Sequence, residues 1–169
     1  MAQKGALGMT SRIEFCRATL FIALALALAL TLAAASPARA DRCEDIANQL
    51  KSNIDGLKVN FTAAGIVYLT HPLAKELTLG CRGADYSNEL YAKADSRKPK
   101  PAFFDLVGSA AAIVFTVPKD DTMTGVSRCI RRMGLLRGDN VTMRFRRLNM
   151  NCTRSKTEAA IAITRGKDE

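Results

Sequence analysis

The arginines in the last third of the chain are the residues whose type and spacing most suggest chemistry. Between residues 128 and 156 there are nine basic side chains and one acidic side chain, and eight of the nine are arginine. A planar guanidinium group matches the geometry of phosphate and carboxylate better than lysine does. We expect five of these arginines to converge on one face and form a binding surface: Arg128, Arg131, Arg132, Arg144 and Arg146. A solvated charged face without a ligand is the alternative.

Catalytic signals are weak. His71 is the only histidine, and its place before Pro72 at the end of a predicted strand indicates a hydrogen-bonded turn residue. Asp105 interrupts an apolar run, which we interpret as an early helical turn. The sequence contains no phosphate-binding glycine loop, no metal-spaced histidine cluster and no nucleophile elbow. We therefore predict no catalytic residue, metal or cofactor. A small carboxylate-based hydrolase is the alternative, and a deep pocket joining Asp105 to His71 or Glu76 would favour it.

Four cysteines follow residue 40, namely Cys43, Cys81, Cys129 and Cys152. An even number of cysteines in an exported chain indicates disulfides, and four cysteines allow three connectivities. We favour Cys43–Cys81 and Cys129–Cys152, because each bond would join a helix to the strands that follow it. Zinc is disfavoured because no pair has the close spacing of a structural site.

The N-terminus has the form of a cleavable signal peptide. Lys4, Arg12 and Arg17 precede a stretch without charges at residues 20–35, and small side chains follow at Ala38 and Ala40. We predict a signal peptide at residues 1–40 and one mature domain at residues 41–169, without a transmembrane segment. An uncut membrane anchor is the alternative, although the apolar run is shorter than a typical span. The leucine–alanine pattern suggests a bacterial periplasmic or secreted protein.

The helices expected in the mature chain follow from apolar residues at helical spacing. The sequence Asp41-Arg-Cys-Glu44 has the form of a capping box, and Gly56 would end the helix that begins there. A second helix, apolar on nearly all sides, is expected at residues 102–117. A third is expected at residues 123–133.

Strands are predicted wherever apolar and polar residues alternate. Three of them form a meander at residues 57–61, 66–70 and 77–81, and a weak fourth lies near Tyr86 and Tyr91. Residues 141–152 are expected to form one strand with a bulge at Arg147, paired with a last strand at 159–163. Strands grouped apart from helices favour a small α+β domain. Its antiparallel sheet, a meander plus a C-terminal hairpin, would pack against about three helices.

Charge and compartment together suggest a class of partner. Removal of residues 1–40 lowers the net charge from +9 to +6, and most of the excess lies after residue 101. The expected function is therefore non-enzymatic binding of an anionic lipid, a lipopolysaccharide or an acidic exported protein. Nucleic acid is disfavoured by the compartment. A protein-docking or inhibitor module is a further alternative, which an exposed apolar patch near Tyr86 and Tyr91 would favour.

Overall fold

A computed structural model describes residues 38–81, 88–134 and 138–166 of the chain. The chain divides into two compact units, residues 1–39 and 40–169, and the second unit is described below, with residues 38 and 39 of the first unit named only as the start of its first helix. Its elements are α2 (Ala38–Asn53), β1 (Lys58–Ala63), β2 (Ile66–His71), β3 (Ala74–Gly80), β4 (Glu89–Ala94), α3 (Pro101–Phe115), α4 (Lys119–Arg132), β5 (Asn140–Phe145), β6 (Leu148–Arg154) and β7 (Ala159–Arg165).

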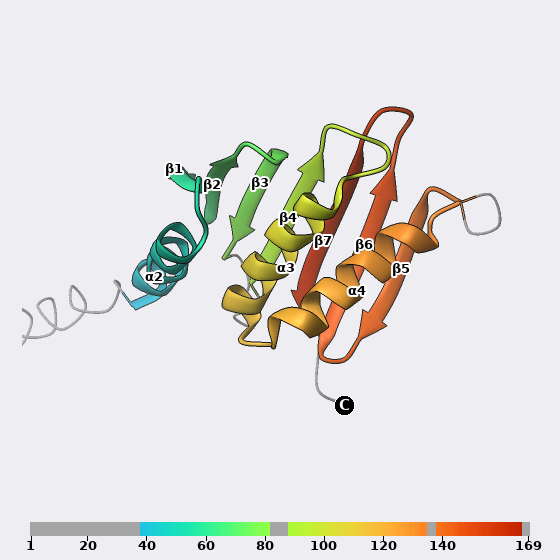
Figure 1. Ribbon diagram of the computed structural model, residues 1–169. Helices are drawn as coiled ribbons and strands as arrows, with labels where there is room; N and C mark the ends of the chain where they lie inside the picture. Colours follow the sequence, from blue (N-terminus) through green and yellow to red (C-terminus); the bar gives the residue numbers. More distant parts are fainter. Residues whose placement is uncertain (1–37, 82–87, 135–137, 167–169) are drawn as a thin grey trace, which may run out of the picture. The chain divides into compact units, whose positions relative to one another are not determined.

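The strands form one antiparallel sheet in the order β1-β2-β3-β4-β7-β6-β5. Pairing of β4 with β7 joins an N-terminal four-stranded meander to a C-terminal three-stranded one, with Leu90 opposite Ile163. The helices α2, α3 and α4 lie against one face of this sheet, so the domain has two layers (Figure 1). The predicted small α+β domain with an antiparallel sheet is confirmed.

The core lies between the helices and the alternate strand residues that face them. Leu79, Leu90, Ile161 and Met150 are fully buried on the helix side of the sheet. From the other layer, α2 contributes the stripe of Cys43, Ala47, Leu50 and Ile54, and α3 contributes most of its length. The opposite face of the sheet carries mostly polar side chains, and none of the described helices lies over it (Figure 1).

The helices α3 and α4 approach each other closely at Gly108. A methyl group on Gly108 would lie 2.4 Å from Cγ of Met123 and 3.1 Å from its Cα. The buried hydroxyl of Thr122 lies at hydrogen-bond distance, 2.7 Å, from two carbonyl oxygens, that of Gly108 in α3 and that of Lys119 in its own helix. Glycine is therefore required here by contact between two helix backbones.

Both predicted disulfides are present. Cys43 of α2 is bonded to Cys81 just after β3, and Cys129 of α4 is bonded to Cys152 of β6. Their Cα–Cα distances are 6.1 Å and 6.0 Å. Each bond thus ties a helix to the part of the sheet that it covers.

Two details of the prediction are wrong. Arg146-Arg147 is not a bulge within one strand but a turn between two strands, β5 and β6. Phe145 before the turn pairs directly with Leu148 after it. Arg146 has a φ of 54°, a conformation that turns usually assign to Gly or Asn, so the sequence carried no turn signal. The first helix begins at Ala38 instead of Asp41. Because the helix starts earlier, the carbonyl groups of residues 38–40 can accept hydrogen bonds from the backbone N–H groups that follow Asp41. A side-chain cap at Asp41 is then not needed for these N–H groups.

Candidate functional site

The outer side of α4 carries three of the five predicted arginines. Val126, Cys129 and Ile130 are buried against the sheet, so helical geometry turns Arg128, Arg131 and Arg132 toward solvent. We call these three residues the α4 arginine cluster. Together with Met123, Thr124 and Ser127, the cluster lines a shallow, open hollow along the helix.

Arg128 is held in place by an aromatic ring. The central carbon of its guanidinium group lies 5.2 Å from the centre of the Phe145 ring, which projects from the end of β5. This distance is within the range of a cation–π interaction. The contact restricts the orientation of Arg128 before any ligand binds.

The other two predicted arginines lie outside α4. In β5, Val141 and Met143 are buried beneath the helices, so the alternating Arg144 lies on the open face of the sheet. Arg146 lies in the β5–β6 turn and pairs with Asp121, in the first turn of α4, at 3.0 Å. The five arginines therefore do not converge on one face.

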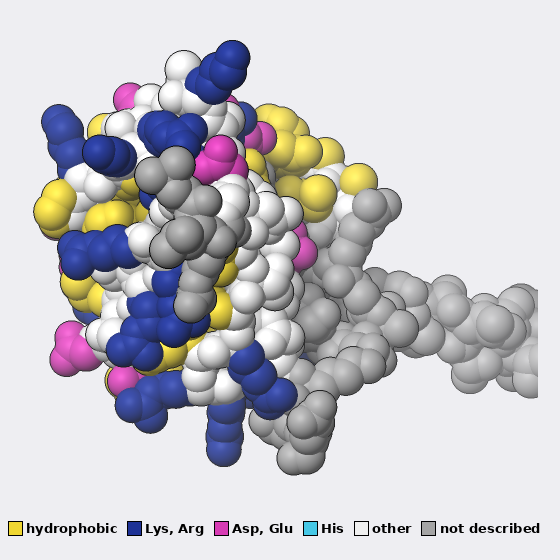
Figure 2. All heavy atoms as spheres, turned by 90° about the vertical axis from the view of Figure 1, so that its right-hand side faces the viewer, with side chains coloured by type: hydrophobic (Ala, Val, Ile, Leu, Met, Phe, Trp, Pro, Cys, Tyr) yellow, Lys and Arg dark blue, Asp and Glu magenta, His cyan; other side chains and the backbone are white. Residues whose placement is uncertain are grey.

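Several further basic residues have structural partners. Arg97 pairs with Asp139 at 3.1 Å and donates to the carbonyl oxygen of Ser155 at 2.8 Å. Arg165 donates to the carbonyl oxygen of Phe115 at the end of α3. Even so, the side of the molecule at the β5 edge displays many Lys and Arg side chains and few Asp and Glu side chains (Figure 2).

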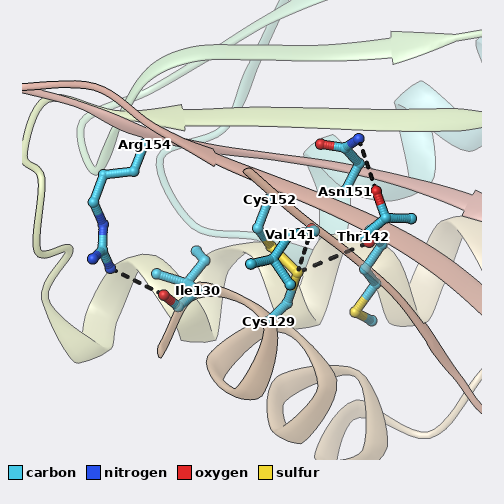
Figure 3. Close-up of a disulfide and its surroundings, with 8 residues drawn as sticks. Cys129, Ile130, Val141, Thr142, Asn151, Cys152 and Arg154 are labelled. Atoms are coloured by element: carbon cyan, nitrogen blue, oxygen red, sulfur yellow. Dashed lines mark hydrogen bonds between the residues drawn. A yellow bond between two sulfur atoms is a disulfide. The ribbon is translucent and has the colours of Figure 1, made fainter. Parts of the chain in front are cut away.

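Arg154 caps the C-terminus of α4 from the neighbouring strand. Its guanidinium group donates to the carbonyl oxygens of Ile130 at 3.0 Å and Met133 at 3.1 Å. Figure 3 shows Arg154 reaching Ile130 on the same stretch of β6 and α4 that the Cys129–Cys152 disulfide joins. Positive charge at a helix C-terminus is favourable because it offsets the negative end of the helix dipole.

A network of charged side chains connects β3, β4 and the start of β7. Glu158 pairs with Lys75 and, at 3.3 Å, with Lys93, which also lies 3.5 Å from Glu76. The hydrogen bond from Lys75 lowers the pKa of Glu158, and the hydrogen bond to Glu158 raises the pKa of Lys93. Partial burial, followed by the charge of Glu76, raises the pKa of neighbouring Tyr91. The pKa shifts of Glu158 and Lys93 come from their ion pairs, and these pairs link adjacent strands.

The residues considered for catalysis are engaged in structural contacts. Both ring nitrogens of His71 have partners, because Nδ1 accepts from the N–H of Leu73 at 3.1 Å and Nε2 lies 3.0 Å from the carbonyl oxygen of Asp55. Asp105 pairs with Lys119 at 2.8 Å. The hollows along α4, beside Pro72 and Leu73, and beside Glu158 are not lined by Asp105, His71 or Glu76. Among the described residues, no cluster has the composition of a metal site.

The open face of the sheet carries an aromatic pair at the β1 edge. Phe61 is 58% exposed and stacks on Tyr68 of β2, with ring centres 4.5 Å apart. Through the strand register, Tyr68 lies opposite Thr78, and Thr78 lies opposite Tyr91. Tyr86 lies outside the described residues.

The predicted signal peptide lies largely outside the described residues, and Ala38 and Ala40 fall in the first turn of α2. The two disulfides are compatible with an exported protein, because such bonds persist in oxidising compartments. Within the described part of the chain, no helix is both long and apolar enough to cross a membrane.

Comparison with known proteins adds no relative, since no protein-family model, curated protein or solved structure matches this chain.

Proposed function

We propose that this protein is an exported, non-enzymatic binding domain that recognises an anionic partner through the α4 arginine cluster. The observation that carries the proposal is the exposure of three arginines on one helix face. Within the described residues, none of the three forms an ion pair with an acidic side chain. An anionic lipid, a lipopolysaccharide or an acidic protein surface would supply the missing counter-charge.

The fold accounts for the cluster only in part: Arg131 and Arg132 lie in the last turn of α4, where positive charge is favourable, and Arg128 stacks on Phe145. Arg128 is spaced three and four residues from Arg131 and Arg132, so the like charges repel across one helix face at a cost of a few tenths of a kcal/mol per pair. Capping does not require the cluster, because Arg154 already satisfies carbonyl groups at the end of α4. An anion bound between the guanidinium groups would remove this repulsion.

The test is salt-dependent binding to vesicles that contain phosphatidylglycerol. We expect binding to weaken steeply with added salt, because the screening length falls to about 8 Å near physiological ionic strength. The variant R128E/R131E/R132E should lose binding and stay folded. The matched control is K51E/K58E/K98E, which changes the net charge by the same amount at exposed lysines away from α4.

Two outcomes would contradict the proposal. Equal loss of binding in both triple variants would mean that only the net charge matters. Folded wild-type protein without salt-sensitive binding to these vesicles or to lipopolysaccharide would mean that the cluster is a solvated surface.

A second candidate function, docking on another exported protein, is supported by the exposed Phe61 and its stacking on Tyr68. It predicts that Phe61→Lys abolishes association with one defined partner and leaves vesicle binding unchanged. Site-specific crosslinking from position 61 in the native envelope, compared with crosslinking from Thr142 on the same face, would test it. Equal crosslinking from both positions would argue against a specific docking surface.

A further inference from the structure

The α4 arginine cluster is interleaved with hydroxyl groups. Thr124 and Ser127 lie on the same side of the helix as Arg128, Arg131 and Arg132, and all five line the hollow along α4. Positions 124 to 132 span about 12 Å of helix axis. The hollow therefore combines guanidinium and hydroxyl donors over little more than two helical turns.

This set of donors is matched to one anion chemistry better than to others. A guanidinium group donates two parallel N–H bonds to a pair of oxygens, and a hydroxyl group adds a single O–H bond. A carboxylate offers two oxygens, and a phosphodiester offers two non-bridging oxygens and one charge. A phosphomonoester offers three terminal oxygens and a charge between −1.5 and −2 near neutral pH, as known for phosphoserine. Three arginines beside two hydroxyls can satisfy all of these oxygens.

The surroundings restrict the hollow to this segment of α4. Toward the N-terminus of the helix, Asp121 neutralises Arg146, so the positive surface ends there. Toward the C-terminus, Arg154 occupies carbonyl groups of Ile130 and Met133. Phe145 fixes Arg128 between these limits, which reduces the conformational entropy that the side chain loses on binding.

We infer that the outer face of α4 is a binding site for a phosphomonoester group. The guanidinium groups of Arg128, Arg131 and Arg132 and the hydroxyl groups of Thr124 and Ser127 would donate the hydrogen bonds. This inference rests on the proposed anion-binding function and specifies its ligand chemistry. The group can be carried by a lipid headgroup or by a soluble phosphate compound.

The test compares full-length mature protein on vesicles of phosphatidic acid, a phosphomonoester, with vesicles of phosphatidylglycerol, a phosphodiester, at matched surface potential. We expect about a tenfold preference for phosphatidic acid, equivalent to about 1.4 kcal/mol. The variant R128K/R131K/R132K keeps every positive charge but lacks the planar guanidinium groups that donate two parallel hydrogen bonds. It should bind both vesicles equally, while T124V/S127A should lose part of the preference and the control T142V should lose none.

The results separate this inference from the proposed function. Equal binding of the wild type to both vesicles, or a preference retained by the lysine variant, would overturn the phosphomonoester site and leave general anion binding intact. Vesicle binding that survives R128E/R131E/R132E would instead overturn the proposed function. With the preference present, competition by a soluble phosphomonoester such as glycerol phosphate would show that the phosphate group alone is recognised, and failure to compete would show that the site needs the lipid surface.

Discussion

Replacing Gly108 by alanine tests how closely the helix that carries the arginine cluster is fitted to its neighbour. The added methyl group would lie 2.4 Å from Cγ of Met123, 3.1 Å from its Cα and 3.2 Å from its backbone nitrogen. Rotation of the Met123 side chain relieves only the first of these contacts. The other two require movement of the α4 backbone, which the hydrogen bond from Thr122 to Gly108 opposes.

Two effects of opposite sign set the magnitude. Alanine in place of glycine inside a helix stabilises it by about 1 kcal/mol. Overpacking of a fitted interior costs about 1–3 kcal/mol, and contact with backbone atoms places this site near the upper end of that range. We therefore expect Gly108→Ala to lower the free energy of unfolding by about 2 kcal/mol.

Urea unfolding of the oxidised protein measures this loss. Gly134→Ala is the control, because a methyl group there has no neighbour within 4 Å, and we expect it to change stability by less than about 0.5 kcal/mol. The double variant G108A/M123A should recover only part of the loss, since the backbone contacts remain. Wild-type or greater stability of Gly108→Ala would refute the reasoning that two helix backbones touch at this position.

Two further predictions concern Arg154 and the charged network. Arg154→Met should destabilise the protein by about 2–3 kcal/mol in urea unfolding, because two charge-assisted hydrogen bonds to the end of α4 are lost, whereas exposed Arg132→Met should have almost no effect. For pH dependence, the lowered pKa of Glu158 stabilises the fold above the unfolded value of about 4.3, and this contribution disappears as pH falls through the folded pKa. The raised pKa of Lys93 stabilises the fold below about 10.4, and this contribution disappears as pH rises through the folded pKa. Thermal unfolding from pH 2 to 12 should therefore decline at both ends, and Glu158→Gln should flatten both declines; equal curves for the two proteins would contradict this assignment.

Much of the fold was predictable because the strongest periodicities belong to buried elements. The stripe of Cys43, Leu50 and Ile54 predicted α2, and its position placed Cys43 where the bond to Cys81 forms. The alternation around Met143 predicted the C-terminal strands. A single sequence shows these periodicities because each helix or strand buries one face, and the apolar residues recur at the spacing of that face.

The weak prediction of β4 and the wrong prediction at Arg146 fall where the sequence pattern is least distinctive. Strand β4 carries polar Glu89 and Lys93 on its open face, and it is confirmed as a strand by its pairing with β7, about 70 residues later. The turn at Arg146 contains no glycine or asparagine, although it adopts a positive φ. The small side chains of Ala92 and Ala94 make the alternation of β4 weak, and the turn at Arg146 has no local signal at all.

The candidate site was predicted only in part, because charge along a sequence does not reveal what each charge contacts. Arg154 lies two residues after Cys152 and appeared as one more member of a basic segment. In the fold it points toward the helix layer and caps α4. Arg144, the residue next to buried Met143, lies on the opposite face from the cluster by strand alternation alone. Applying that alternation together with the helical period of α4 would have separated them in advance.

What the structure adds to the arginine cluster is a rigid support. Three interactions of different chemistry hold α4 in place. They are the disulfide between Cys129 and Cys152, the hydrogen bond from Thr122 to Gly108, and the hydrogen bonds from Arg154 to carbonyl groups at the end of the helix. None of them uses a residue of the cluster, so the guanidinium groups remain available to an anion. Because the helix is already fixed, a ligand that binds there has to order only the side chains, and a smaller entropy loss means tighter binding for the same contacts. In the proposed site, the arginines expected to bind an anion are therefore the three of α4 that form no ion pair among the described residues, fewer than the charge of the segment suggests.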